Sequence, residues 1–318
     1  MNHPALRVTG LHKTFTDASG LLGRSRRTVH AVRGVDLDVA QGETMGIVGE
    51  SGCGKTTLAR MLVGLTRPTQ GRIEINGVER TGESTRRFGR DIQYVFQDPT
   101  SSLNPRMTIR EILSVPLQHL HGMDEPSRTS RIAEIIEAVN LRPQFLDRHP
   151  HEFSGGQAQR IGIARALAAD ARILVLDEPV SALDVSIQAQ VLNLLADLKA
   201  AYGLTYIFIS HDLAVVEAIS DRVAVFYAGS VVEIGPAEGI FAAPRHPYCK
   251  LLADSAPVIG KPMPRQETAL NDGAINPAQG SGCAFAPRCT HASDICRAQQ
   301  PTLDGPPRHE AACFHPLA

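Results

Sequence analysis

The chain has 318 residues, more than the roughly 250–300 at which one hydrophobic core stops growing, so we expect one full domain and a smaller unit. Its formal net charge of −1 excludes the general positive field of a nucleic-acid-binding protein, and we expect no nucleic acid partner. No apolar run approaches the roughly 18–20 residues of a membrane span, and the first residues lack a signal-peptide pattern, so we expect a cytoplasmic protein.

Short β-type runs alternate with helical runs through the first 256 residues. Apolar, β-branched runs predict strands, and segments with a period of about 3.6 residues predict helices. The alternation predicts an α/β domain with a largely parallel sheet, interrupted by a helical insert at about residues 106–150. The expected strands are residues 5–10, 35–39, 43–48, 71–77, 91–96, 172–179 and 204–210, and the expected helices include 55–65, 131–141, 155–170 and 186–203.

The composition changes after about residue 257. Nine of the 21 prolines lie in the last 62 residues, which predicts a loop-rich appendage without a long helix or sheet. Four of the six cysteines also lie there, and a cytoplasmic setting argues against disulfides between them. Such a small unit needs some other means of holding its shape. The four cysteines are Cys283, Cys289, Cys296 and Cys313.

The segment "GESGCGKTT" matches the pattern G-x-x-x-x-G-K-[ST] between a predicted strand and a predicted helix. In this pattern backbone N–H groups surround phosphate oxygens, Lys55 reaches the β- and γ-phosphates, and the Thr56 hydroxyl binds Mg²⁺. A flexible glycine-rich loop is the alternative, and the strand–loop–helix context argues against it. The expected phosphate-binding residues are Gly49, Glu50, Ser51, Gly52, Cys53, Gly54, Lys55, Thr56 and Thr57.

Two further motifs are candidates for catalysis and for anion binding. "ILVLDEP" is a predicted buried strand that ends in Asp177, which can hold Mg²⁺ through water, and Glu178, which can polarise an attacking water. Alone, this acid pair is equally typical of a plain acidic turn. "SGGQ" opens a predicted helix, whose bare N-terminus is an anion site. It consists of Ser154, Gly155, Gly156 and Gln157.

Together these motifs resemble the ATP-binding subunits of ABC transporters. "SGGQ" resembles the family signature, "VFQD" with Gln97 resembles the Q-loop, and "SALD" with Asp184 resembles the D-loop. "ISHD" carries His211, which is similar to the switch histidine, and Phe15 in "LHKTF" is similar to the aromatic residue that stacks on adenine. The resemblance implies catalytic roles for Glu178, His211 and Gln97, and Mg²⁺ held by Thr56, Gln97 and Asp177.

The resemblance also implies a layout. We expect a P-loop ABC ATPase core at residues 1–256, with an antiparallel β subdomain near 5–85 and a helical subdomain at about 98–160. Residues 257–318 form the appendage. By the same resemblance, Ser154, Gly155, Gly156 and Gln157 close on ATP held by a partner ATPase subunit, and Asp184 is a further nucleotide-binding residue.

Several longer segments resemble the oligopeptide/dipeptide importer branch, which also includes nickel and glutathione importers: "DPTSSLNPRMTI", "RHPYCKLL" and "GCAFAPRC". This implies a heterodimer with a second related ATPase, with a homodimer as the alternative. It also implies two transmembrane permeases, an extracytoplasmic binding protein and a peripheral location at the cytoplasmic face of the membrane.

Soluble ATPases fit the sequence less well. ABC-type DNA-repair proteins carry a long coiled coil between Q-loop and signature, whereas about sixty residues without heptads separate Gln97 from Ser154. A translation-factor ATPase would carry two ATPase domains, and one phosphate loop is present. The third alternative, a P-loop kinase, does not explain the presence of "SGGQ".

The tail cysteines follow the spacing C-x₅-C-x₆-C-x₁₆-C. Structural zinc sites usually contain C-x₂₋₄-C, which is absent, whereas wider gaps suit a bulkier 4Fe-4S cluster held by four thiolates. Some importers of this branch carry such a cluster. Zinc, with His291, His309 or His315 as substitute ligands, and unligated thiols are the alternatives.

Overall fold

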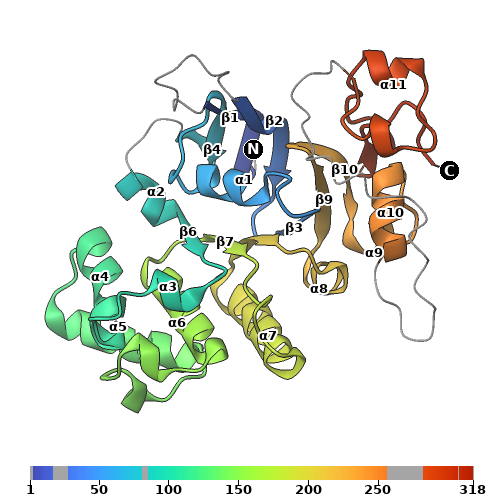
Figure 1. The fold of residues 1–318 in the computed structure, drawn as a ribbon. Coiled ribbons are helices and arrows are strands. Elements are labelled where there is room, and N and C mark those ends of the chain that lie inside the picture. The colour runs from blue at the N-terminus through green and yellow to red at the C-terminus, as the bar shows by residue number, and fades with distance from the viewer. Residues whose placement is uncertain (1–2, 17–27, 81–84, 256–281, 307, 318) are drawn as a thin grey trace, which may run out of the picture.

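The computed structural model describes residues 3–16, 28–80, 85–255, 282–306 and 308–317. Its main element is a seven-stranded sheet with the order β11-β10-β9-β3-β8-β7-β6 (Figure 1). The pairs among β9, β3, β8, β7 and β6 are parallel, and β10 and β11 are added antiparallel at one edge. The strands are β3 (Thr44–Val48), β6 (Ile92–Val95), β7 (Ile173–Asp177), β8 (Thr205–Ile209), β9 (Arg222–Tyr227), β10 (Ser230–Pro236) and β11 (Glu310–Ala311).

The central strands are buried on both faces. Every residue of β3, β7 and β8 is buried, which is why their sequences are apolar almost throughout and do not alternate with polar residues. Alternate side chains enter different cores: Ile173 and Val175 face one core, and Leu174 and Leu176 face the other. The α/β fold with a largely parallel sheet is therefore confirmed.

A second, four-stranded sheet is antiparallel throughout, with the order β2-β1-β4-β5. Its strands are β1 (Leu6–Thr16), β2 (Thr28–Val39), β4 (Gln70–Ile75) and β5 (Val78–Glu79). β3 and α1 (Lys55–Leu62) lie between β2 and β4 in sequence, yet β3 pairs in the large sheet. One hydrophobic core joins β1, β2 and β4 to α1 and to one face of the large sheet, so the phosphate loop lies where the two sheets meet.

The segment between β6 and β7 is helical. It contains α3 (Pro99–Ser102), α4 (Ile109–His121), α5 (Glu125–Ala138) and α6 (Gly155–Ala168), which gather at the β6 end of the large sheet (Figure 1) and share one hydrophobic core with it. Thr108 and Glu111 form a capping box at the start of α4, and Asp124 caps α5. None of residues 98–160, all of which the structure describes, belongs to a strand. α6 continues beyond residue 160, so its C-terminal part extends past the expected boundary of the helical subdomain.

The remaining helices flank the sheets and the helical segment. α7 connects β7 to its parallel neighbour β8, and α8 connects β8 to β9, which lies on the other side of β3 in the sheet. These helices are α2 (Thr85–Asp91), α7 (Val185–Tyr202), α8 (Leu213–Ile219), α9 (Ala237–Ile240) and α10 (Pro247–Ser255).

The described part of the tail contains only short elements, as its prolines predict: η4 (Ala286–Arg288), α11 (Asp294–Ala298) and β11. It is nevertheless attached to the core. β11 pairs with β10, and the ring of Phe285, which is 3% exposed, packs against Tyr227 and Tyr248. The tail therefore shares a hydrophobic core with the rest of the chain and contributes a strand to the large sheet.

Candidate functional site

The phosphate-loop segment, residues 49–57, connects the buried strand β3 to α1. Gly49 and Gly54 both have positive φ, of 152° and 111°. A Cβ atom at Gly49 would lie 2.1 Å from the carbonyl oxygen of Phe226, and one at Gly54 would lie 2.2 Å from that of Ala31. Only glycine fits these two positions, because both the backbone angle and the surrounding backbone exclude a side chain.

The predicted phosphate-binding lysine is directed into this loop. The Lys55 Nζ atom donates hydrogen bonds to the backbone carbonyls of Gly49, at 2.7 Å, and Glu50, at 3.0 Å. The side chain is buried, so the ammonium group is held inside the loop and away from bulk solvent. This places a fixed positive charge among the backbone N–H groups that would face phosphate oxygens.

The expected Mg²⁺ residues meet at the end of β7. Asp177 is 4% exposed, and its carboxylate accepts hydrogen bonds from the hydroxyls of Tyr94 and Thr56. Burial raises the pKa of Asp177, because a charged carboxylate is poorly solvated there. A divalent cation bound here would compensate that cost, and the pairing of Thr56 with Asp177 fits the donor set that Mg²⁺ prefers.

The three expected catalytic residues lie within hydrogen-bond distance of one another. The Glu178 carboxylate accepts from Gln97 Nε2 at 2.9 Å, and its other oxygen lies 3.2 Å from His211 Nδ1. Each residue follows a different strand, β6, β7 or β8, and these are neighbours whose carboxyl ends meet at one edge of the sheet. Glu178 has φ of 48°, a strained angle for a non-glycine residue that is typical of functional sites.

The signature residues lie elsewhere on the chain. Ser154 caps α6 and forms a capping box with Gln157. A Cβ atom at Gly156 would lie 2.4 Å from Ile187, whose backbone N–H donates to Asp184 at 3.0 Å. The signature and Asp184 are thus brought together at the starts of α6 and α7. Within the described residues, the side chains of Ser154, Gln157 and Asp184 form local hydrogen bonds that do not reach residues 49–57.

Phe15 lies near the end of β1, opposite Val29 on β2. Its side chain is 46% exposed, and the Lys13 ammonium lies 4.9 Å from the ring centroid. The ring therefore lies at the surface and is not part of the hydrophobic core. Stacking on adenine stays a prediction. The segment 17–27 that follows lies outside the described residues.

Sequence reasoning missed two tyrosines at this site. Tyr94 was only one member of the predicted strand 91–96, yet its hydroxyl bonds to Asp177, and burial raises its pKa. Tyr248 belongs to the segment "RHPYCKLL", which predicts no site role for it, yet its hydroxyl accepts a hydrogen bond from the backbone N–H of Glu50 at 2.9 Å. The sequence offers one signal for both: each tyrosine stands among apolar residues, and a buried tyrosine hydroxyl usually has a specific hydrogen-bond partner.

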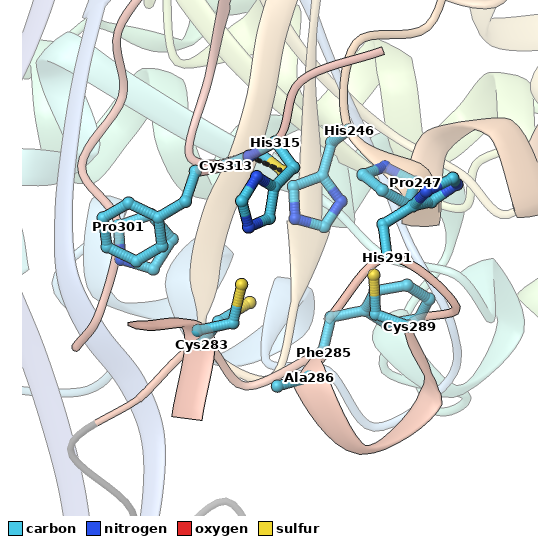
Figure 2. A pocket seen from close by; sticks show the side chains of 12 residues that line it. His246, Pro247, Cys283, Phe285, Ala286, Cys289, His291, Pro301, Cys313 and His315 are labelled. Carbon is cyan, nitrogen blue, oxygen red and sulfur yellow. Dashed lines mark hydrogen bonds between the residues drawn. The ribbon is translucent and has the colours of Figure 1, made fainter. Parts of the chain in front are cut away.

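The four tail cysteines line one pocket together with His246, His291 and His315 (Figure 2). Two close approaches of the backbone bring Cys283 and Cys296 together. The Cys283 N–H donates to the Cys296 carbonyl at 2.7 Å, and a Cβ atom at Gly282 would lie 2.5 Å from that same oxygen. Burial raises the pKa of the Cys283 and Cys313 thiols, which favours their neutral forms.

Among the described residues, the pocket offers thiol and imidazole side chains but no preformed metal site. Across the described ranges, no three His, Cys, Asp or Glu side chains are arranged so that they could hold one metal ion. The donor set nevertheless suits a metal, and the backbone N–H of His315 lies 3.4 Å from Cys313 Sγ, a contact that would stabilise a thiolate. His309, one of the proposed substitute ligands, lies outside the pocket lining, because its Nε2 pairs with buried Glu233 at 2.7 Å. His246 lines the pocket instead, and burial lowers its pKa to about 4.

A phosphate loop, a buried acid beside Thr56 and a glutamate in contact with both Gln97 and His211 define a P-loop ATPase of the ATP-binding-cassette class. Comparison with known proteins agrees. The ABC transporter family model matches residues 32–181, and the model for the oligopeptide/dipeptide transporter C-terminal region matches residues 232–296.

Two curated relatives span nearly the whole chain. The Probable D,D-dipeptide transport ATP-binding protein DdpF of Escherichia coli strain K12 is 44% identical over 319 residues, covering 100% of both chains. The oligopeptide transport ATP-binding protein OppF of the same strain is 45% identical, covering 96% of this chain and 93% of its own. The chain therefore belongs to the ATP-binding subunits of oligopeptide/dipeptide ABC transporters, a family of ATPases.

The fold also matches solved structures. A dimeric post-hydrolysis state of the ATP-binding cassette MJ0796, bound to ADP and Pi, is 28% identical with a TM-score of 0.65, covering 74% of this chain and 99% of that chain. Within the described residues, no helix is both long and apolar enough to cross a bilayer.

Proposed function

We propose that this protein is the ATP-hydrolysing subunit of an importer for di- or oligopeptides. The observation that carries the proposal is the contact of Glu178 with both Gln97 and His211 beside the phosphate loop. The relatives, named for dipeptide and oligopeptide transport, supply the cargo class. Import of nickel or glutathione is the second candidate, and a soluble ATPase without transport is the third.

The side chains divide the work of hydrolysis. The loop of residues 49–57 binds the phosphates, with Lys55 supplying charge to the β- and γ-phosphates. Mg²⁺ held by Thr56, Gln97 and Asp177 would neutralise charge that develops on the phosphate oxygens. Glu178 accepts the proton of the attacking water, and His211 holds the glutamate in place through its 3.2 Å contact.

The signature acts on a second nucleotide. Ser154, Gly155, Gly156, Gln157 and Asp184 are gathered at the starts of α6 and α7 and bond locally, which supports a role toward ATP bound by a partner subunit. ATP binding then draws two ATPase subunits together, and hydrolysis lets them part. Phe15 stacks on the adenine of the ATP bound by this chain.

The partners follow from the family. We propose a heterodimer with a second related ATPase, docked through the helical subdomain at residues 98–160 on two permeases at the cytoplasmic face of the membrane. An extracytoplasmic binding protein delivers the cargo. Native mass spectrometry of the purified transporter tests this arrangement, because two copies of this one chain would contradict the heterodimer.

The pocket of Cys283, Cys289, Cys296 and Cys313 is proposed to bind a 4Fe-4S cluster, with zinc as the alternative. The shared pocket and the N–H contact to Cys313 support a bound metal centre. Such a group would supply a fixed shape to a tail that has little core of its own.

Uptake of a labelled dipeptide tests the function. Cells that lack this chain should regain uptake with the parent protein and fail to regain it with Glu178→Gln. Unlabelled peptides should compete, whereas nickel and glutathione should not. Competition by nickel or glutathione alone would replace the peptide assignment. If the protein stayed in the soluble fraction whether or not the permeases were expressed, that result would favour a soluble ATPase.

A further inference from the structure

The tail reaches the phosphate loop directly. The Arg288 guanidinium donates two hydrogen bonds to the Glu50 carboxylate, one to each oxygen and both 2.9 Å long. Glu50 is the second residue of the loop and lies 238 positions away in sequence. A planar guanidinium that pairs with both oxygens fixes the direction of the carboxylate as well as its charge.

Glu50 is also held through its backbone. Its N–H donates to the Tyr248 hydroxyl at 2.9 Å, and its carbonyl accepts from Lys55 Nζ at 3.0 Å. Tyr248 is fully buried and packs against Phe285 of the tail, with ring centroids 5.5 Å apart. The tail therefore contacts the loop directly through Arg288, and it supports the loop indirectly through the Phe285 ring that packs against Tyr248.

Arg288 itself is held in place. Its guanidinium lies 5.8 Å from the ring centroid of Tyr227 and 5.7 Å from that of Phe285. Its hydrogen bonds with Glu50 raise the pKa of Arg288, so the guanidinium stays charged. The two paired side chains are only 28% and 32% exposed, which reduces screening by solvent.

We propose that Arg288 is a positioning residue for ATP binding, which neutralises and orients Glu50 and thereby fixes the start of the phosphate loop. Without Arg288, the Glu50 carboxylate would carry an unpaired negative charge on the loop that binds a polyanion, and Coulomb repulsion would weaken ATP binding. The inference requires only the ATP site, so it depends neither on the cargo nor on what the tail cysteines bind.

Arg288 is also the last residue of η4 and precedes Cys289, which lines the cysteine pocket. The residue that holds the loop is therefore adjacent in sequence to the cysteine pocket, and through it the tail contributes to the ATP affinity of the core.

The test uses the full-length chain and a fluorescent, non-hydrolysable ATP analogue. Arg288→Gln keeps the stem and a hydrogen-bonding end but removes the charge, and we expect the dissociation constant to rise about 5- to 20-fold. Arg297→Ala, which removes an exposed tail arginine, is the matched control and should leave the constant unchanged. In the assembled transporter, Arg288→Gln should raise KM for ATP and change kcat less than about 2-fold.

Repeating the substitution in the Glu50→Gln background separates positioning from a general structural role. With the carboxylate already neutral, Arg288→Gln should change the dissociation constant less than about 2-fold, because the charge to be neutralised is gone. An equal loss in both backgrounds would show that Arg288 only stabilises the tail, and an unchanged constant in the parent background would also overturn the proposal.

Arg288→Lys covers the case in which the glutamine variant does not fold. Lysine keeps the charge but cannot pair with both oxygens, so we expect a smaller rise of about 2- to 5-fold that again disappears in the Glu50→Gln background. A rise that persists there would contradict the proposal.

Discussion

The ATP site and the cysteine pocket are built in different ways. Gln97, Glu178 and His211 follow adjacent parallel strands, and their side chains already form contacts of 2.9 and 3.2 Å. The cysteines come from short elements and loops, and they share a pocket without converging on one ion. A sheet places catalytic side chains through its backbone pairing, whereas a loop-rich tail brings ligands near one another and leaves the final geometry to whatever binds.

The largest expected effect is at the ATP site, whose side chains are positioned by the sheet. Glu178→Gln removes the group that accepts a proton from water while preserving its size, so we expect ATP hydrolysis to slow by ~10²–10⁴-fold with the ATP-bound dimer trapped closed. Single-turnover hydrolysis by the assembled transporter measures this. Lys55→Ala is the contrasting control, since it should weaken nucleotide binding instead. Turnover by Glu178→Gln at the parent rate would remove Glu178 from its catalytic role.

The next effect concerns the attachment of the tail. Phe285→Ala removes a buried ring that contacts Tyr227 and Tyr248, at an expected cost of about 3–5 kcal/mol to the docking of the tail. Hydrogen exchange should therefore rise at residues 283–300 and stay low in β7 and β8. Ile295→Ala, at a 41% exposed position, is the matched control and should change little. Uniform loss of protection would show that the tail and the core unfold as one unit.

A third experiment examines the ligand of the cysteine pocket. After anaerobic purification, we expect about four irons and matching sulfide per chain, and loss of both in Cys289→Ser. Cys249→Ala, at a cysteine outside the pocket lining, should keep them. Stoichiometric zinc without iron would replace the cluster by a zinc site, and neither metal would leave the thiols unligated.

The smallest effect is expected at Phe15. Phe15→Ala removes an exposed ring, and loss of stacking should weaken ATP binding about 3- to 10-fold. Affinity for inorganic triphosphate should stay the same, because that ligand has no base. Val29→Ala, at the exposed position opposite on β2, is the control. Equal weakening for both ligands would show that Phe15 acts on the loop rather than on adenine.

Much of the ATP site could be predicted from sequence because its determinants are local. The phosphate loop, the acid pair and His211 each follow an apolar strand, and the strand order then brings Gln97 and His211 to Glu178. β9 and β10 were absent from the expected strands, although both are largely buried. β11 is a two-residue strand, too short for any periodic signal.

The contacts of the tail could not be predicted. The pairing of Arg288 with Glu50 depends on packing between segments more than two hundred residues apart, and no periodicity records it. The same limit applies to His309, where sequence proximity to the cysteines suggested a ligand but the fold directs its ring to Glu233. The spacing of the cysteines in sequence restricts which thiols can lie close together, whereas tertiary packing determines which histidines lie beside them.

The pairing of β11 with β10 has a consequence for synthesis. β10 ends at Pro236, whereas the strand that covers its edge begins at Glu310, so roughly 70 further residues must be translated before the sheet is complete. At about 5–20 residues per second, the nascent ATPase part keeps an open strand edge for on the order of 4–15 s. Open edges promote pairing between chains, so we expect neighbouring nascent chains to associate most readily during this period, which ends when β11 pairs with β10.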